Sequence, residues 1–187
     1  YKTIDEYWKI NNHCENRYDY TVSWVDCLYS KKNDLRGVYI AGNHSQQQIN
    51  NKIKKEYKIK FPVTPPFSFV NNVSMRTLNN FYYFLNKRSN ESTQHYKKFF
   101  FPLDVIQNWN RAYGKEGFFQ YQFVVPKKNG EKVINQVLKV IKRHNQVPAL
   151  GVLKNFGNIK SPGLLSFPME GVTLALDFPN KGLKTNN

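Results

Sequence analysis

Alternating apolar and polar side chains predict most of the strands in this chain. Successive residues of a strand point to opposite faces of a sheet, so a two-residue period marks sheet structure. We predict strands over residues 20–27, 37–42, 117–126 and 148–156, and further strand in residues 164–168 and 171–179.

Apolar positions three and four residues apart predict two amphipathic helices. In residues 73–87 the predicted buried stripe is Met75, Leu78, Tyr82 and Leu85, with Phe81 beside it and Ser74 as the cap. In residues 130–145 the predicted stripe is Val133, Val137, Val140 and Ile141. A shorter pattern in residues 99–114 indicates an extended piece, then a helical turn or two that ends near Gly114.

The order of these elements predicts an α+β fold. The last third of the chain runs β-α-β-β, which is the opening half of a split β-α-β, ferredoxin-like unit. We expect an antiparallel sheet with helices on one face, in a domain over residues 20–179. Residues 1–19 are expected to be a poorly defined N-terminal segment. Because a second helix and strand should complete such a unit, residues 180–187 are expected to be a tail truncated inside a domain.

Residues 43–72 show no periodic pattern. They are polar and rich in lysine before a stretch that contains Pro62, Pro65 and Pro66. Proline disrupts both helices and central strands. We therefore predict a mobile loop in this segment.

Composition indicates a folded protein with a basic surface. With 40% hydrophobic and 16% aromatic residues, the 187-residue chain can bury a core, which excludes a largely disordered chain. Its net charge of +15 attracts anions such as nucleic acid, phosphorylated substrates or acidic membrane surfaces. The lysines are scattered, however, and the composition is typical of an AT-rich genome. We favour compositional drift over a dedicated binding face.

The cysteines and histidines argue against a disulfide framework and against a metal site. Cys14 and Cys27 form no C-x-x-C motif and no disulfide framework, which favours a reducing compartment. The four histidines lack the spacing of metal ligands, so no metal site is expected. No apolar run approaches the length of a membrane span and no signal peptide is visible, so we predict a cytoplasmic protein.

Two glutamines interrupt an otherwise apolar strand. Phe118, Gln120, Gln122 and Val124 share one face of the strand over residues 117–126, and the other face is entirely apolar or aromatic. A buried amide without a partner costs about 1–3 kcal/mol. Either the two amides bond to nearby backbone or to each other, or they line a polar pocket over the sheet. We favour the pocket.

Lys154 and Asp177 repeat this pattern on the next two strands. Each lies on a mostly apolar face, and Asp177 shares its face with Thr173. An ammonium on such a face needs an anionic or strongly polar partner. A Lys154–Asp177 ion pair and a ligand held beside these residues are compatible interpretations. We predict that the glutamines, Lys154, Thr173 and Asp177 line one face of one sheet, and that the helix over residues 130–145 covers the other.

Several longer stretches resemble a known family. They are FFFPLDVIQNWNRAYGKEGFFQYQFVVP (99–126), LKNFG (153–157), LLSFP (164–168) and GVTLALDFP (171–179), preceded by SWVDC (23–27) and LRGVYIAGNHS (35–45). They closely resemble the substrate domain of FAD-linked oxidoreductases of the vanillyl-alcohol oxidase superfamily. The Asn-Trp-Asn-Arg motif and QYQF favour the branch that oxidises polyprenyl-phosphoryl sugars, and the resemblance runs from about residue 20 to the end of the chain.

The resemblance implies a pocket between this sheet and a flavin. In that family an N-terminal domain binds FAD, and the substrate domain is an antiparallel sheet with helices that lies over the flavin ring. The pocket residues that it implies are Trp24, Phe100, Asn110, Tyr113, Gln120, Gln122, Lys154, Phe156, Thr173 and Asp177. Lys154 and Gln122 are the best candidates to polarise the flavin or the substrate. Phe100, Phe101 and Thr173 depart from the tyrosine, histidine and asparagine of the family pattern, which leaves the exact substrate open.

The implied chemistry is oxidation of a secondary sugar hydroxyl, with hydride transfer to the flavin and the proton taken by a base. No glycine-rich flavin-binding segment occurs in these residues, and the family's catalytic lysine has no counterpart. We therefore expect FAD to be held mainly by a domain outside this chain, and the fragment alone to be inactive. The implied partners are that FAD domain, a sugar or prenyl-phosphoryl sugar, and a reductase of the same pathway. Peripheral association with the inner membrane, where prenyl-linked sugars reside, is compatible with this interpretation.

Three other functions fit parts of the sequence. An aldonolactone or sugar-alcohol oxidase of the same superfamily shares the implied fold. A basic nucleic-acid-binding module fits the charge and the aromatic residues, but no recognised motif occurs and neither face of residues 118–125 carries a basic side chain, so no nucleic acid is expected. A purely structural interaction domain does not explain the polar residues on apolar faces.

Overall fold

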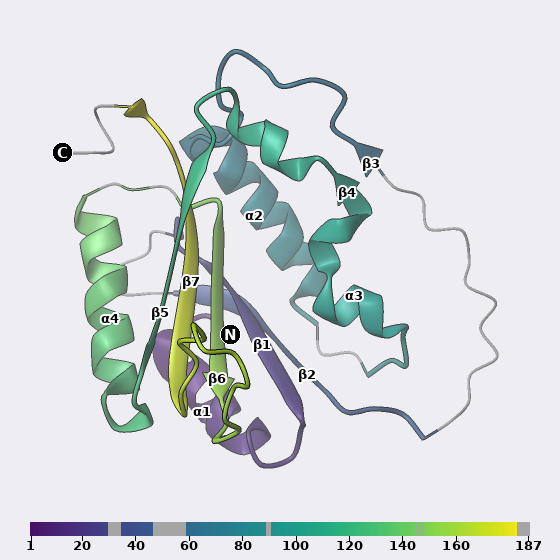
Figure 1. Cartoon of the computed structure of the whole chain (residues 1–187), viewed down its shortest axis with the longest axis vertical. Helices are drawn as coiled ribbons and strands as arrows, with labels where there is room; N and C mark the ends of the chain where they lie inside the picture. Colours follow the sequence, from purple (N-terminus) through teal and green to yellow (C-terminus); the bar gives the residue numbers. More distant parts are fainter. Residues whose placement is uncertain (30–34, 47–58, 89–90, 145, 147, 183–187) are drawn as a thin grey trace.

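The computed structural model describes residues 1–29, 35–46, 59–88, 91–144, 146 and 148–182 (Figure 1). Its helices are α1 (Ile4–Cys14), α2 (Asn72–Asn86), α3 (Tyr96–Phe100) and α4 (Lys127–Arg143), with 3-10 turns η1 (Pro102–Val105) and η2 (Trp109–Tyr113). Its strands are β1 (Tyr20–Asp26), β2 (Arg36–Gly42), β3 (Ile59–Lys60), β4 (Ile106–Gln107), β5 (Phe118–Val125), β6 (Leu150–Phe156) and β7 (Gly171–Pro179). These elements confirm the predicted α+β fold.

The main sheet has the strand order β2-β1-β6-β7-β5, and every neighbouring pair is antiparallel. Strands β5 and β6 are therefore parallel, joined by α4, with β7 inserted between them. This is the predicted split β-α-β arrangement. Strands β1 and β2 extend the sheet beyond β6.

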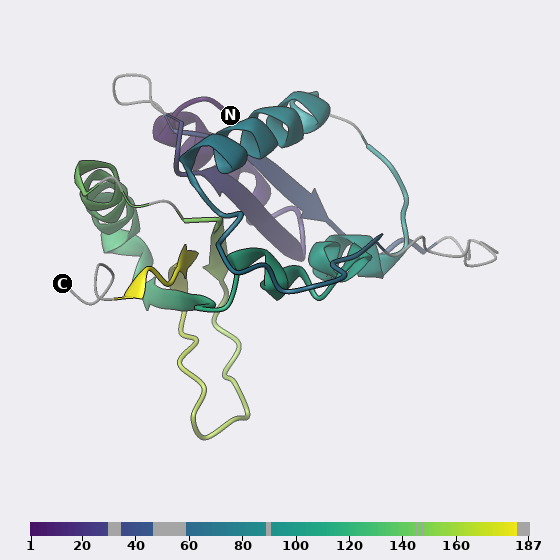
Figure 2. The ribbon, with the colours of Figure 1, turned by 90° about the horizontal axis from the view of Figure 1, so that it is seen from above.

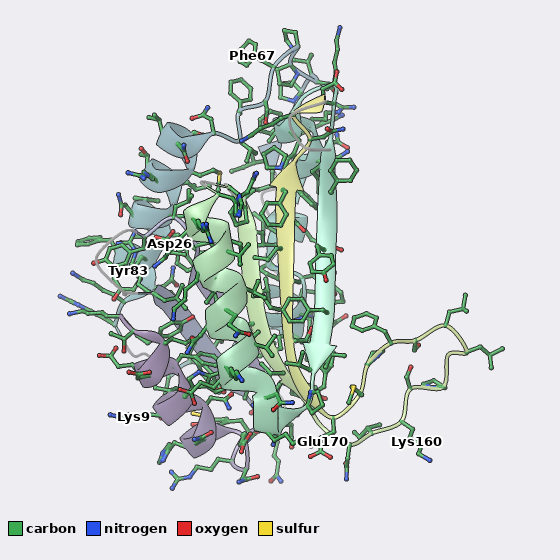
Figure 3. The ribbon with its side chains drawn as sticks, turned by 90° about the vertical axis from the view of Figure 1, so that its left-hand side faces the viewer. Lys9, Asp26, Phe67, Tyr83, Lys160 and Glu170 are labelled. Carbon is green, nitrogen blue, oxygen red and sulfur yellow. The ribbon has the colours of Figure 1, made fainter. Side chains whose placement is uncertain are left out.

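The predicted strand in residues 164–168 is wrong. These residues belong to the loop between β6 and β7, which projects away from the sheet (Figures 2 and 3). Leu164 and Leu165 are fully exposed. The segment lies between Pro162 and Pro168, and Ser166 N donates to Gly163 O at 3.2 Å, so its backbone turns instead of extending.

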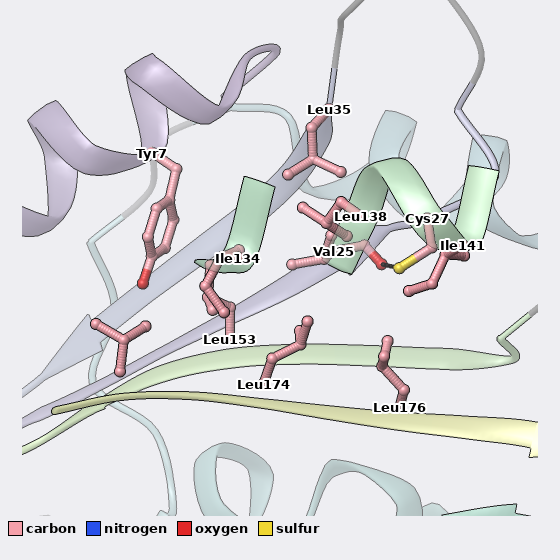
Figure 4. Close-up of a cluster of buried hydrophobic side chains, with 11 residues drawn as sticks. Tyr7, Val25, Cys27, Leu35, Ile134, Leu138, Ile141, Leu153, Leu174 and Leu176 are labelled. Carbon is pink, nitrogen blue, oxygen red and sulfur yellow. Dashed lines mark hydrogen bonds between the residues drawn. The ribbon is translucent and has the colours of Figure 1, made fainter. Parts of the chain in front are cut away.

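The main core lies between the sheet and the helices α1 and α4, which cover the same face (Figure 3). Leu153, Leu174 and Leu176 point from the sheet towards Ile134 and Ile141 of α4 (Figure 4). The alternation of strand residues puts the aromatic side of β5 on this face as well, with Phe123 and Val125 packed against the core.

Helix α4 covers the sheet as predicted, and the predicted stripe holds for Ile141, which is buried, and for Val137, which packs against the core. Its buried residues are Gly130, Ile134, Leu138 and Ile141, and Val140 is 56% exposed. A Cβ at Gly130 would lie 2.7 Å from Val172 Cγ2, so the glycine lets the helix approach β7 closely. The predicted stripe is therefore wrong at Val140, because the close approach at Gly130 turns Ile134 and Leu138 towards the sheet instead.

The sequence pattern predicted no regular element in residues 1–19, whereas the structure has helix α1 there. Thr3 caps it by accepting from Glu6 N at 3.1 Å. Its buried residues are Tyr7 and Asn11, and the Tyr39 hydroxyl donates to Asn11 Oδ1 at 3.1 Å. Ile4 and Trp8 pack beside Tyr7, but this apolar stripe is short because Asn11 takes the next inward position.

Helix α2 lies against the opposite face of the sheet, over β1 (Figure 1). Its cap is Asn71 and not Ser74: Asn71 Oδ1 accepts from Ser74 N, and Asn71 N donates back to Ser74 Oγ. The predicted stripe holds for Met75, which is buried, and for Tyr82, which is half-buried. Leu78 and Leu85 are more than half exposed, so the stripe is wrong there.

Residues 59–71 and 91–114 lie along the same side of the molecule as α2. Strand β3 pairs with β4 in parallel, and Phe69 N donates to Ala112 O at 2.8 Å. Residues 99–101 were predicted as extended, but α3 includes Phe100. The turn that ends near Gly114 is confirmed by η2. Residues 47–58 of the predicted mobile loop lie outside the described residues, and its mobility stays a prediction.

Among the helices that the structure describes, none combines the length and apolar character needed to cross a membrane.

Candidate functional site

The predicted polar residues come together on one face of strands β5, β7 and β6. We call this surface the polar face and define it by Gln120, Gln122, Lys154, Thr173 and Asp177. The register places Gln120 opposite Asp177 and Lys154 opposite Thr173. These residues point away from the core that α1 and α4 cover, because the core residues of the same strands alternate with them. The predicted arrangement of these five residues on one face is confirmed.

Each glutamine donates to a side chain of β7. Gln120 Nε2 donates to Asp177 Oδ1 at 2.9 Å, and Gln122 Nε2 donates to Thr173 Oγ1 at 3.1 Å. The threonine hydroxyl in turn donates to Phe123 O at 2.8 Å. Both glutamines are exposed, and an amide has a second N–H and a carbonyl oxygen. The amides are therefore held in place and still accessible to a ligand.

Lys154 is half-buried and does not pair with Asp177. In the register Asp177 lies opposite Leu150, four residues along β7 from Thr173, a separation of about 13 Å along an extended strand. The predicted Lys154–Asp177 ion pair is therefore wrong. No carboxylate in the part of the chain that the structure describes pairs with the Lys154 ammonium. It is a positive charge on the polar face that an anion can approach.

Asp177 is a buried carboxyl, with 2% of its surface exposed. Burial raises its pKa above the usual range, and the hydrogen bond from Gln120 opposes this shift only in part. The carboxyl therefore holds a proton more readily than an exposed aspartate. It fixes Gln120 and is itself out of contact with solvent.

Two small apolar residues, which sequence reasoning missed as part of the site, lie between the polar ones. Gln122, Ala175, Val152 and Trp24 lie side by side across β5, β7, β6 and β1. Because the side chains of Ala175 and Val152 are short, the centre of this row rises little above the sheet. Only the strand register identifies them, because each looks like an ordinary strand residue in the sequence.

Trp24 joins this row to α2. It is half-buried, and its ring lies 4.8 Å from the ring of Tyr82. Beside it, the buried Asp26 carboxylate binds Arg36 at 2.7 Å and accepts from Asn79 Nδ2 at 2.7 Å. Asn79 belongs to α2, so this polar cluster fixes the helix at the edge of the row. Sequence reasoning missed the cluster, because its members lie on three separate elements.

Tyr113 lies in a second, smaller core at the Gln120 end of the polar face. It is 3% exposed and stacks on Phe118 with ring centroids 4.4 Å apart. Burial raises its pKa, and the nearby Asp177 carboxyl adds to the shift. Val70 and Met75 complete this core. The structure thus gives Tyr113 a packing role beside the face, under the turn that carries it.

The remaining predicted residues lie at the borders. Asn110 is exposed on η2, at a shallow hollow lined also by Arg111 and Phe118. Phe156 is half-buried at the end of β6, opposite Gly171. Phe100 is 41% exposed, and its ring packs on Tyr20 at the far end of β1. The structure therefore does not bring Phe100 to the glutamines.

Comparison with known proteins relates the chain to part of an enzyme. No protein-family model matches the chain. The decaprenylphosphoryl-β-D-ribose oxidase of Mycolicibacterium smegmatis is 30% identical to it over 177 residues. The chain is related to a part of this oxidase. The alignment covers 89% of the chain and 38% of the length of decaprenylphosphoryl-β-D-ribose oxidase, which confirms the resemblance seen in the sequence motifs.

The chain thus spans well under half of decaprenylphosphoryl-β-D-ribose oxidase. What the relative's name says of its substrate concerns that protein, and its transfer to this chain is a proposal.

Proposed function

We propose that this chain is the substrate-binding part of an FAD-dependent oxidoreductase. In this proposal the full-length protein oxidises a secondary hydroxyl of a prenyl-phosphoryl-linked sugar by hydride transfer to flavin. The observation that carries the proposal is the polar face: two accessible amides and an ammonium without an ion-pair partner among the described residues, around a low apolar centre. The relationship to decaprenylphosphoryl-β-D-ribose oxidase supports both the reaction class and the substrate class.

The residues present fit a flavin. A planar ring needs a flat apolar surface, which Ala175 and Val152 supply, and polar groups at its edge, which Gln122 and Lys154 supply. Lys154 has no paired carboxylate among the described residues to compete for its charge. A bound FAD would accept the hydride from the carbinol carbon. The adenine and diphosphate parts would be held by a domain outside this chain.

The chain's own residues would orient the substrate and polarise the substrate or the flavin. The bonds from Gln120 to Asp177 and from Gln122 to Thr173 fix both amides before a ligand arrives, and preorganised donors are worth more than ones that must reorient. The free amide groups can then bind sugar hydroxyls. The Lys154 ammonium would stabilise negative charge at the edge of the ring or on a substrate phosphate. Trp24 supplies an apolar wall at the other end of the row.

The test is a visible spectrum of the full-length protein, recorded without oxygen before and after addition of a prenylphosphoryl pentose. The proposal predicts a yellow protein whose flavin absorbance bleaches with the pentose. A protein that stays colourless with added FAD would contradict the flavin assignment. A yellow protein that does not bleach would keep the flavin and contradict the substrate class.

A further inference from the structure

Helix α2 exposes an unusually apolar side to solvent, although Met75 and Tyr82 also place apolar surface on its inward side. Its inward side carries Asn79, which is 5% exposed and bound to Asp26. Its outward side carries five exposed apolar residues, with the exposed Thr77 among them. The exposed fractions are 77% for Val73, 56% for Leu78, 61% for Phe81, 65% for Phe84 and 59% for Leu85. A helix facing only water would carry polar side chains at these positions, so this side has another surrounding in the working protein.

The charged residues in the sequence around this apolar side are mostly basic. The charged residues between positions 59 and 101 are Lys60, Arg76, Lys87, Arg88, Lys97 and Lys98, against the single acid Glu91. The Lys87 ammonium lies over the ring of Phe84, 4.3 Å from its centroid, so charge and apolar surface adjoin directly. Aromatic and aliphatic side chains with lysine and arginine beside them are the pattern of helices that lie in a membrane interface.

Helix α3 adds to the same side. Its Phe100 packs on Tyr20 while Tyr82 of α2 packs on Trp24. Tyr20 and Trp24 are four residues apart on β1, so both helices stand on one face of that strand. Tyr96 and Phe101, at the two ends of α3, are each about half exposed, and Lys97 and Lys98 lie between them.

We propose that α2, together with α3, is a membrane-interfacial surface that docks the protein on an anionic lipid bilayer. The apolar residues enter the boundary between headgroups and acyl chains, and the basic residues pair with anionic headgroups. An acidic protein partner would satisfy the charges, whereas an anionic bilayer satisfies the charges and also takes up the phenylalanine and leucine side chains, which are 56% to 65% exposed.

This surface adjoins the polar face. Tyr82 of the docking helix touches Trp24, and Trp24 is in register with Val152 and, through β7, with Gln122. A lipid-linked sugar held in the bilayer would therefore meet the polar face beside the membrane surface. This link to substrate delivery rests on the proposed function, whereas lipid binding by α2 does not.

The test is co-sedimentation of the full-length protein with vesicles of phosphatidylcholine, alone or mixed with phosphatidylglycerol. Two outward residues are changed together in the variant Phe81→Ser, Phe84→Ser. The matched control is Leu164→Ser, Leu165→Ser, which removes two exposed apolar residues from the loop between β6 and β7. A third variant, Arg76→Gln, Lys87→Gln, removes charge alone.

The proposal predicts that binding needs phosphatidylglycerol and weakens by about tenfold or more in the phenylalanine variant. Each lost basic residue should weaken it about fivefold, and the leucine control should bind as the parent protein does. The proposal would be overturned if the parent protein did not bind the vesicles that contain phosphatidylglycerol. It would also be overturned if the leucine control lost as much binding as the phenylalanine variant. Neither result involves the flavin spectrum, so a failure here is distinct from a failure of the proposed function.

Discussion

Asp177 is the residue of the polar face whose ionisation is most tightly linked to folding. Its folded-state pKa lies above the ordinary value of 3.8 because it is buried. The unfolded chain therefore releases this proton more readily than the folded one. Ionised Asp177 costs stability at neutral pH, and the cost disappears as the pH falls below the unfolded-state value.

The change Asp177→Asn should therefore stabilise the protein at neutral pH. An asparagine keeps an oxygen that accepts the hydrogen bond from Gln120 Nε2. Urea unfolding should show a higher midpoint for the variant at neutral pH, and the difference should shrink towards zero in acid. Asp104→Asn, at an exposed position, is the control and should change little. A variant less stable than the parent at neutral pH would show that Asp177 is held ionised.

Gly114 is a second residue that allows a test, because its backbone conformation and its close neighbours both require glycine. Its φ is +77°, and an added Cβ would lie 2.8 Å from the backbone of Phe67. Gly117 has a φ of +71° with nothing within 4 Å of the Cβ position. Gly117→Ala should thus cost only the left-handed strain of about 1–2 kcal/mol, and Gly114→Ala should cost clearly more.

Thermal or urea unfolding of these two variants measures the difference directly. Gly157→Ala is the control, because Gly157 has neither a positive φ nor a neighbour within 4 Å. Equal losses at positions 114 and 117 would mean that the segment around Phe67 moves aside freely, and that η2 is not fixed against it.

At the scale of elements, α2 is fixed to the sheet by a buried polar cluster. The Asp26 side chain is 2% exposed and binds Arg36, which is 12% exposed, at 2.7 Å. Asn79 adds the bond from α2, and the Arg36 guanidinium lies over the rings of Tyr29 and Tyr83. The cluster holds together three elements, so its loss should loosen the whole edge of the sheet.

The change Asp26→Ala should destabilise the protein by about 3–5 kcal/mol, because it leaves Arg36 buried without its partner. Urea unfolding measures the change in the free energy of unfolding. Lys127→Met is the control: it removes the exposed ion pair with Glu15, at 46% and 22% side-chain exposure, and should cost less than about 1 kcal/mol. Equal losses in the two variants would contradict a special role for the buried cluster.

The elements also show what the sequence could reveal. The five strands of the main sheet and helix α4 follow from clear periodicity, and the face shared by Gln120, Gln122 and Lys154 follows from strand alternation alone. Helix α1 was missed because its apolar stripe is short and is interrupted by the buried Asn11. The stripes of α2 and α4 were set by contacts with Asp26 and Val172 that only the fold brings near. The register that separates Lys154 from Asp177 was equally beyond the sequence, because no local pattern fixes which strands pair.

At the scale of the whole molecule, the sheet has two differently used faces. One is sealed by α1 and α4 over the main core. The other carries the polar face at β5, β7 and β6, with α2 and α3 over β1 at its border (Figure 1). In the two proposals these parts have separate roles, because the polar face meets flavin and sugar while the border helices meet lipid.

The central claim is that a flavin lies against the polar face, and the most direct measurement is the flavin midpoint potential of the full-length protein with Lys154→Met. If the ammonium stabilises the reduced ring, its loss should lower the potential by about 30–60 mV, the equivalent of one charge-assisted hydrogen bond. Lys139→Met, on the exposed side of α4, should leave the potential unchanged. No substrate is needed for this measurement. An unchanged potential in the Lys154 variant would contradict the placement of the flavin on this face.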